Sequence, residues 1–205
     1  MALLYRADLT PGKLDLLAAW LPGRPWYAGP ERPDLQKVSA FRFDDPAGAV
    51  GVETILVRAE AGGPVFQTPL TYRDAPLEGA DAHLLGTSEH SVLGRRWIYD
   101  AAADPVYAAC LATAVLTGGT EAPEELSSDG VVRSRTPSMS VRGTGSPSAA
   151  VPPVTAIDAI SDANPTVVSA SSVSLTIFRV LDGTTAAGTP ALMWESQPLA
   201  LVRVI

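Results

Sequence analysis

The chain contains one cysteine and two histidines among its 205 residues. A single thiol, Cys110, excludes an internal disulfide and suits a reducing compartment. So few cysteines and histidines also argue against a zinc site. No apolar run approaches the roughly 20 residues that a membrane span needs, and the first residues lack the apolar core of a signal peptide. We therefore expect a cytoplasmic protein without a membrane segment.

Lysine is almost as scarce, with only Lys13 and Lys37. The 15 basic residues are outnumbered by 22 acidic ones, which gives a net charge of −7. Such a chain repels a phosphate backbone on average, so we expect no nucleic-acid partner. Proline and glycine are plentiful, at 18 and 17 residues, and they favour short strands and turns over a helical bundle.

The first part of the chain predicts one helix followed by strands. Thr10 and Pro11 suit an N-cap and a first helical residue, and the predicted helix covers residues 11–21. Its apolar stripe has helical spacing and consists of Leu14, Leu17, Ala18 and Leu21. Strand-like segments follow at residues 35–44, 50–60, 65–72, 83–91 and 95–100. Short connections between them predict an antiparallel meander.

A second helix is predicted to begin at Asp104 and Pro105 and to end at Gly118. Cys110 falls on its apolar face, where we expect a small buried residue and not a nucleophile. Residues 117–153 are rich in Gly, Pro, Ser and Thr, which is typical of a loop or linker, with one strand expected within 131–142. Three later apolar runs, at 167–181, 191–195 and 199–205, predict further strands.

Several motifs of the first 118 residues resemble one family. The segment WLPGRPWYAG at residues 20–29, the pattern Phe66-x-x-Pro69-Leu70 and the later Tyr99-Asp100 pair carry the likeness. They resemble the N-terminal cap domain of maltokinase and related actinobacterial sugar kinases, including kinases of the glucosamine type. The resemblance implies an α+β fold, in which a curved antiparallel, cystatin-like sheet packs against one or two helices. It also implies a cap-like domain at 1–118. Composition predicts a linker at 119–153, and the apolar runs predict C-terminal strands within 154–205, which either extend the same sheet or form a vestige of the kinase N-lobe.

The run VSLTIFRVL at residues 173–181 resembles the maltokinase strand that carries the ATP-binding lysine within ILKLFRRL. The lysine position corresponds to Thr176, whose hydroxyl cannot supply the positive charge that draws ATP phosphates into place. Residues 162–168 resemble the QSNTSVV segment of the nucleotide cover. The sequence given ends at Ile205, before a catalytic loop or a metal-binding aspartate. We therefore expect no phosphoryl transfer, no cofactor and no metal.

The resemblance favours a non-catalytic accessory protein of α-glucan, trehalose or amino-sugar metabolism. Its partner would be a protein such as a sugar kinase or an α-glucan enzyme, or else a carbohydrate ligand. The candidate contact residues are aromatic or charged and precede or flank predicted turns: Trp26, Tyr27, Tyr72, Arg73, Glu89, His90, Arg95 and Arg96. Packing in the corner between helix and sheet is the other interpretation of Trp26 and Tyr27.

Two alternatives stay open at this point. The first is an enzyme of unrecognised type that uses Glu89, His90 or Asp100 as acid–base groups, although neighbours in a strand point to opposite faces. The second is one part of a split sugar kinase. A glycine-rich turn at residues 142–146, RGTGS, could cradle a phosphate, but it lacks the lysine of a P-loop, and we interpret it as a turn.

Overall fold

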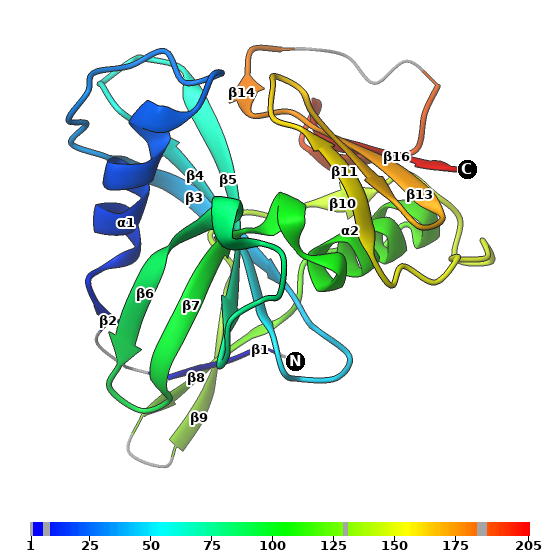
Figure 1. Ribbon diagram of the computed structural model, residues 1–205. Coiled ribbons are helices and arrows are strands. Elements are labelled where there is room, and N and C mark those ends of the chain that lie inside the picture. The colour runs from blue at the N-terminus through cyan, green and yellow to red at the C-terminus, as the bar shows by residue number, and fades with distance from the viewer. Residues whose placement is uncertain (1, 6–8, 129–130, 184–187) are drawn as a thin grey trace.

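The computed structural model describes residues 2–5, 9–128, 131–183 and 188–205 (Figure 1). Its elements are short helices and curved antiparallel sheets, so the predicted α+β class is confirmed. Two large sheets stand side by side in Figure 1, and helix α2 lies below the C-terminal one. No helix in the described residues is long and apolar enough to cross a membrane.

The first large sheet, here called the cap sheet, has its strands in the order β2-β6-β7-β5-β4-β3. Their bounds are β2 Leu9–Thr10, β3 Gln36–Phe43, β4 Gly51–Arg58, β5 Val65–Arg73, β6 Leu84–His90 and β7 Gly94–Asp100. The predicted meander, in which each strand pairs with the next one along the chain, was wrong in one place. β5 does not pair with β6 but with β7, where Leu70 lies opposite Asp100, and β6 pairs with the other edge of β7. The 3-10 turn η2 (Asp81–His83) carries the chain from β5 past β7 to reach β6.

Helix α1 (Lys13–Trp20) covers one face of the cap sheet and continues into the 3-10 turn η1 (Leu21–Gly23). The helix begins later than predicted, because Thr10 belongs to β2 and pairs with Glu89. Gly12 is the N-cap, and its N–H donates to the Asp15 carboxylate at 3.0 Å. The predicted stripe was also partly wrong. The helix buries Leu16 and Trp20 beside Leu17, while Leu14 and Ala18 are half-buried.

Helix α2 (Pro105–Thr117) follows the 3-10 turn η3 (Ala101–Ala103) and is almost entirely apolar. Its predicted ends are confirmed. The Asp104 side chain accepts from the N–H of Val106, and Gly118 ends the helix in the left-handed region at φ 72°. The helix joins two layers, because one buried cluster contains Phe41 and Val52 of the cap sheet, Leu111 of α2 and Leu175 of the C-terminal strands.

The second large sheet, here called the C-terminal sheet, is antiparallel in the order β10-β15-β16-β13-β12-β11. Its strands are β10 Arg142–Gly143, β11 Ile157–Ser161, β12 Thr166–Ala170, β13 Val173–Ile177, β15 Ala191–Trp194 and β16 Gln197–Val204. It does not extend the cap sheet strand by strand. One short strand crosses between them: β14 (Val180–Leu181) pairs with Val65 and Phe66 of β5. The apolar run at 167–181 is therefore divided among β12, β13 and β14.

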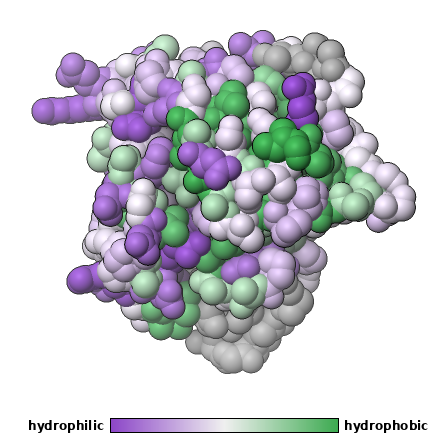
Figure 2. Space-filling model, turned by 45° about the vertical axis from the view of Figure 1, so that its right-hand side comes forward, coloured by the Kyte–Doolittle hydropathy of each residue, from purple (hydrophilic) through white to green (hydrophobic). Residues whose placement is uncertain are grey.

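The segment predicted as a linker contains ordered strands. β8 (Glu124–Ser128) and β9 (Val131–Arg135) form a hairpin, and β8 also pairs in parallel with β1 (Ala2–Tyr5). The strand expected within 131–142 corresponds to β9, which ends at Arg135, and to β10, which begins at Arg142. The outer surface is mixed in character. Figure 2 shows hydrophobic groups near the top and right of one face, among hydrophilic ones.

Candidate functional site

The strand that resembles the lysine-bearing strand of the kinases places Thr176 in the middle of the C-terminal sheet. Thr176 is half-buried in β13 and lies opposite Val167 of β12 and Leu201 of β16. Val173, Leu175 and Ile177 alternate with it and are fully buried. Thr176 therefore belongs to the outer face of the sheet, and its two cross-strand neighbours are uncharged.

Three residues after Thr176, Arg179 joins the two large sheets. Its side chain is fully buried, and Nη2 donates to both carboxylate oxygens of Asp100 at 2.7 and 3.0 Å. Nε donates to the Thr166 hydroxyl at 2.8 Å, and the guanidinium lies over the Trp26 ring, 5.2 Å from its centre. Gln67 of β5 adds a second link, because its side-chain amide donates to the backbone carbonyls of Phe178, just after β13, and of Leu199 in β16. Asp100, a candidate acid–base group, is thus engaged in a structural ion pair.

The aromatic pair Trp26 and Tyr27 lies in the corner between α1 and the cap sheet. The Trp26 indole N–H donates to the Asp162 carboxylate at 2.8 Å, and its ring meets Trp20 edge to face. The Tyr27 ring lies 5.0 Å from that of Phe66, and its hydroxyl donates to the Pro30 carbonyl. Trp26 is buried and Tyr27 is half-buried, and both side chains pack against the cap sheet.

Tyr72 belongs to a buried charged cluster under α1 that was not predicted. Its hydroxyl donates to Glu53 at 2.7 Å, and the same carboxylate oxygen accepts from Lys13 at 2.6 Å and lies 3.1 Å from Arg42. Burial alone would raise the pKa of Glu53, but the charges of Arg42 and Lys13 and the hydrogen bonds lower it to about 2. The only signal in the sequence was one acid within the apolar run VETILV.

Arg73 is bound to the N-cap of α2. Its Nε and Nη2 each donate to one oxygen of the Asp104 carboxylate at 2.7 Å. Asp104 is fully buried and also caps the helix through Val106. One edge of the guanidinium, Nε with Nη2, is engaged in this bidentate ion pair, which gives Arg73 a structural role.

The remaining four candidates come together in the β6–β7 hairpin. Glu89 and Arg95 face each other across the strands and form an exposed ion pair at 2.7 Å. His90 Nδ1 accepts from two backbone N–H groups of the turn, at 3.2 and 3.1 Å, and Arg96 donates to the carbonyl of Leu93. Partial burial, and then Arg96, lower the pKa of His90. The imidazole therefore stabilises the turn as a neutral acceptor.

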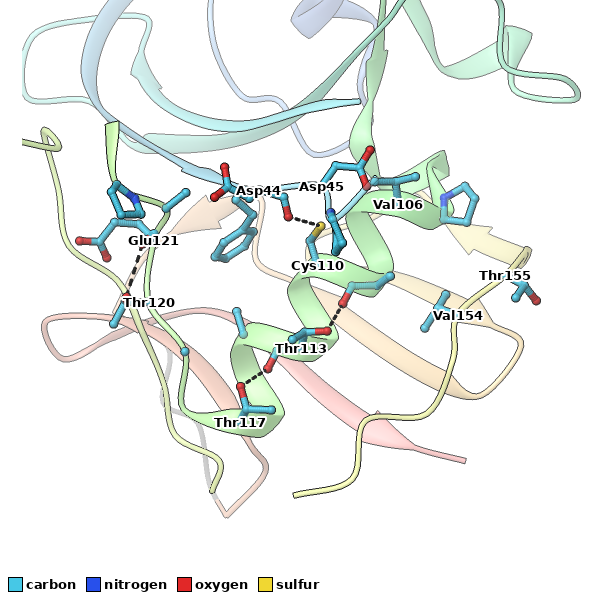
Figure 3. A pocket seen from close by; sticks show the side chains of 18 residues that line it. Asp44, Asp45, Val106, Cys110, Thr113, Thr117, Thr120, Glu121, Val154 and Thr155 are labelled. Atoms are coloured by element: carbon cyan, nitrogen blue, oxygen red, sulfur yellow. Dashed lines mark hydrogen bonds between the residues drawn. The ribbon is translucent and has the colours of Figure 1, made fainter. Parts of the chain in front are cut away.

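A cavity that sequence reasoning missed lies along α2. Its volume is about 630 Å³, and it opens between the β3–β4 turn, the outer side of α2, and the segments around residues 119–123 and 154–155 (Figure 3). Its apolar lining includes Phe43, Val106, Ala109 and Val154. Cys110 also lines it, and the thiol lies 3.4 Å from the carbonyl oxygen of Asp44. Burial, and then Asp45, Asp104 and Asp44, raise the pKa of this thiol to about 12, so it stays protonated.

Residues 20–104 match the family model of the maltokinase N-terminal cap domain. The match runs from the last residue of α1 to the N-cap of α2 and includes strands β3 to β7. This segment is similar to the maltokinase N-terminal cap domain. No curated protein matches the chain.

The cap-like domain provides only one wall of the cavity, the β3–β4 turn with Phe43, Asp44, Asp45 and Pro46. The rest comes from α2 and from segments beyond the match. The glycine-rich turn RGTGS docks on the same helix. Gly145 and Ser146 donate to the carbonyls of Val115 and Leu116, so these N–H groups bind the helix end and do not form a phosphate cradle.

Proposed function

We propose that the chain is a non-catalytic, maltokinase-cap-like accessory protein, which acts by binding an enzyme of α-glucan, trehalose or amino-sugar metabolism. Thr176 carries this proposal. At the position where the resemblance places the ATP-binding lysine, a half-buried neutral hydroxyl lies between Val167 and Leu201. A neutral side chain cannot attract or hold nucleotide phosphates as a lysine does.

The base that follows Thr176 most closely in the sequence, Arg179, and the two lysines of the chain do not replace the missing kinase lysine. Arg179 is fully buried and ion-paired with Asp100, so its charge is neutralised inside the protein. The two lysines belong to α1 and β3 of the cap side, and Lys13 is paired with Glu53. Arg203 of β16 lies opposite Ser174 on the same face and is exposed, so the proposal concerns the position of the kinase lysine and not every base of the C-terminal sheet.

The β6–β7 hairpin is the surface that we assign to the protein partner, with a sugar kinase as the expected class. The hairpin turn exposes Val92 and Leu93 at 56% and 45% of their surface. The ion pair of Glu89 and Arg95 lies beside them and is also exposed. Apolar side chains bordered by charges of both signs are typical of protein contacts, and the His90 hydrogen bonds hold this turn in a fixed shape.

The proposal is tested by two measurements on the same preparation. Thermal unfolding is recorded with MgATP, maltose and glucosamine, since a ligand that binds only the folded state raises the melting temperature. Affinity capture from the source cells is then compared for the wild type and a Val92→Asp, Leu93→Asp variant. We expect no MgATP shift, and capture of a sugar-metabolising enzyme that the variant loses. The proposal would be overturned if MgATP stabilised the protein and either sugar were phosphorylated. It would also be overturned if the variant captured the same enzyme as the wild type.

A further inference from the structure

The cavity along α2 has the dimensions of a small-molecule site. Its volume of about 630 Å³ lies within the range of roughly 300–1,000 Å³ that is usual for ligand pockets. Three separate parts of the chain line it: the β3–β4 turn, one side of α2, and the segments around residues 119–123 and 154–155 (Figure 3). The Asp104 and Gly118 caps fix both ends of the helix, so this wall is preformed.

The hydroxyl groups of the lining already have partners within the chain. Thr113 and Thr117 donate to backbone carbonyls one helical turn earlier, at 2.8 and 2.7 Å. Thr120 donates to the carbonyl of the next residue at 3.4 Å. The exposed Thr155 hydroxyl lies 3.5 Å from that of Ser171, and either oxygen can be the donor. A ligand without hydrogen-bonding groups would therefore leave these hydroxyls paired.

The three acids of the lining, Asp44, Asp45 and Glu121, do not form a cation site. Figure 3 shows the Asp45 and Glu121 side chains on opposite sides of the cavity. Asp45 accepts from three backbone N–H groups of its own turn and interacts electrostatically with Arg73. Glu121 accepts from the segment at residues 140–141, and Asp44 also has an interaction partner. The charge of the three acids still opposes an anionic ligand, because no base is among the described residues that line the cavity.

Most of the remaining lining is apolar and comes from all three parts of the chain. Phe43 ends β3, Val106 and Ala109 belong to α2, and Val154 belongs to the last segment. We propose that this cavity binds a compact, neutral and mainly apolar small molecule, which packs against these four side chains. Such a ligand covers apolar surface that is otherwise in contact with water, and it displaces water that has few polar partners there. An ammonium group finds the carboxylates apart and engaged, and a carboxylate is repelled by them.

The test uses three probes with the same phenylbutyl body and different charge. Binding of 4-phenyl-1-butanol, 4-phenylbutylamine and 4-phenylbutyrate to the full chain is measured by titration calorimetry and ligand-observed NMR at neutral pH. We expect the alcohol to bind with a Kd of roughly 1 mM or tighter, the amine to bind no more tightly than the alcohol, and the acid to bind about tenfold or more weakly. The proposal would be overturned if the alcohol did not bind, if the amine bound more tightly than the alcohol, or if the acid bound as tightly.

Matched variants locate the site. Ala109→Trp, at a half-buried position of α2, and Thr113→Trp, at an exposed one, should each fill the cavity and weaken binding of the alcohol about tenfold or more. Val92→Trp on the β6–β7 hairpin adds the same side chain outside the cavity and should leave binding unchanged. The melting temperature of each variant shows whether it is folded, and Thr113→Trp still tests the site if Ala109→Trp unfolds.

Failure here is distinguishable from failure of the accessory-protein proposal. Alcohol binding that survives both blocking variants would place the ligand elsewhere and would contradict this inference alone. If no probe bound and Ala109→Trp lost partner capture, the cavity would be a protein-docking surface and this inference would be wrong. Loss of partner capture in the Val92→Asp, Leu93→Asp variant concerns the hairpin, whereas the probe titrations concern α2.

Discussion

Arg179 Nη2 and Asp100 Oδ2 lie 2.7 Å apart in the interior, with the two side chains 0% and 3% exposed. Asp100 ends the last strand of the cap sheet, and Arg179 stands between β13 and β14, where the chain passes from one large sheet to the other. The pair therefore holds the cap sheet and the C-terminal sheet together. It also explains why neither residue is available for chemistry.

Replacement of Arg179 by Met should lower the free energy of unfolding by roughly 3–5 kcal/mol, because Asp100 is left as an uncompensated buried charge. Equilibrium urea unfolding followed by fluorescence measures this change, and Trp26 beside the guanidinium is a local reporter. The matched control is Arg95→Met, which breaks an exposed pair and should cost no more than about 1 kcal/mol. Equal costs for the two variants would refute the structural role of Arg179.

The buried cluster around Glu53 gives a second prediction. Glu53→Gln keeps the shape but removes the charge that Lys13 and Arg42 face, and we expect a loss of roughly 2–4 kcal/mol. Lys13→Met should cost less, because burial lowers the pKa of Lys13 despite its partner, so the charged form is already disfavoured. Urea titrations of both variants at pH 7 decide this order, and a larger loss in Lys13→Met would contradict it.

The shifted pKa of Glu53 also predicts how the free energy of unfolding depends on pH. The pKa of Glu53 falls from an ordinary 4.5 to about 2 on folding, so its contribution is present above pH 4.5 and is lost as pH falls toward 2. Wild-type stability should therefore drop more steeply than that of Glu53→Gln over this range. Urea midpoints measured at half-unit pH steps give the two slopes. Parallel curves would mean that Glu53 does not titrate with the shifted pKa.

Gly145 tests the docking of the glycine-rich turn on α2. A Cβ built at this position would overlap the carbonyl of Leu116, so the backbone must move away from the helix. We expect Gly145→Ala to cost roughly 1–3 kcal/mol and to speed amide exchange at Ser146. Gly23→Ala is the control, because nothing lies within 4 Å of its added Cβ and its φ is not positive. A neutral Gly145→Ala would show that the turn is loosely attached.

Local sequence signals predicted the features that depend on neighbouring residues. Asp104 with Pro105 and the later Gly118 gave both ends of α2, since caps are set within one turn of the helix. The start of α1 was wrong because Thr10 pairs with Glu89, a contact 79 positions away. Backbone pairing across the sheet thus overrides a local cap signal.

The junction and the cavity could not be predicted for the same reason. Asp100 and Arg179, or Asp44 and Cys110, meet only once the sheets are assembled. The charged and aromatic residues chosen from sequence turned out to include Trp26, Tyr72 and Arg73, which hold the fold together. A polar residue at the end of a strand is expected to have an interaction partner. The sequence does not show whether that partner is another residue of the same chain or an external molecule.

Binding of MgATP to the wild-type chain is the most direct test of the central claim, that the position of Thr176 cannot support nucleotide chemistry. Isothermal titration calorimetry with the full chain, repeated with Thr176→Lys, measures it. The account predicts no saturable heat from the wild type up to millimolar nucleotide. One-site binding by the wild type with a Kd of roughly 1 mM or tighter would contradict it.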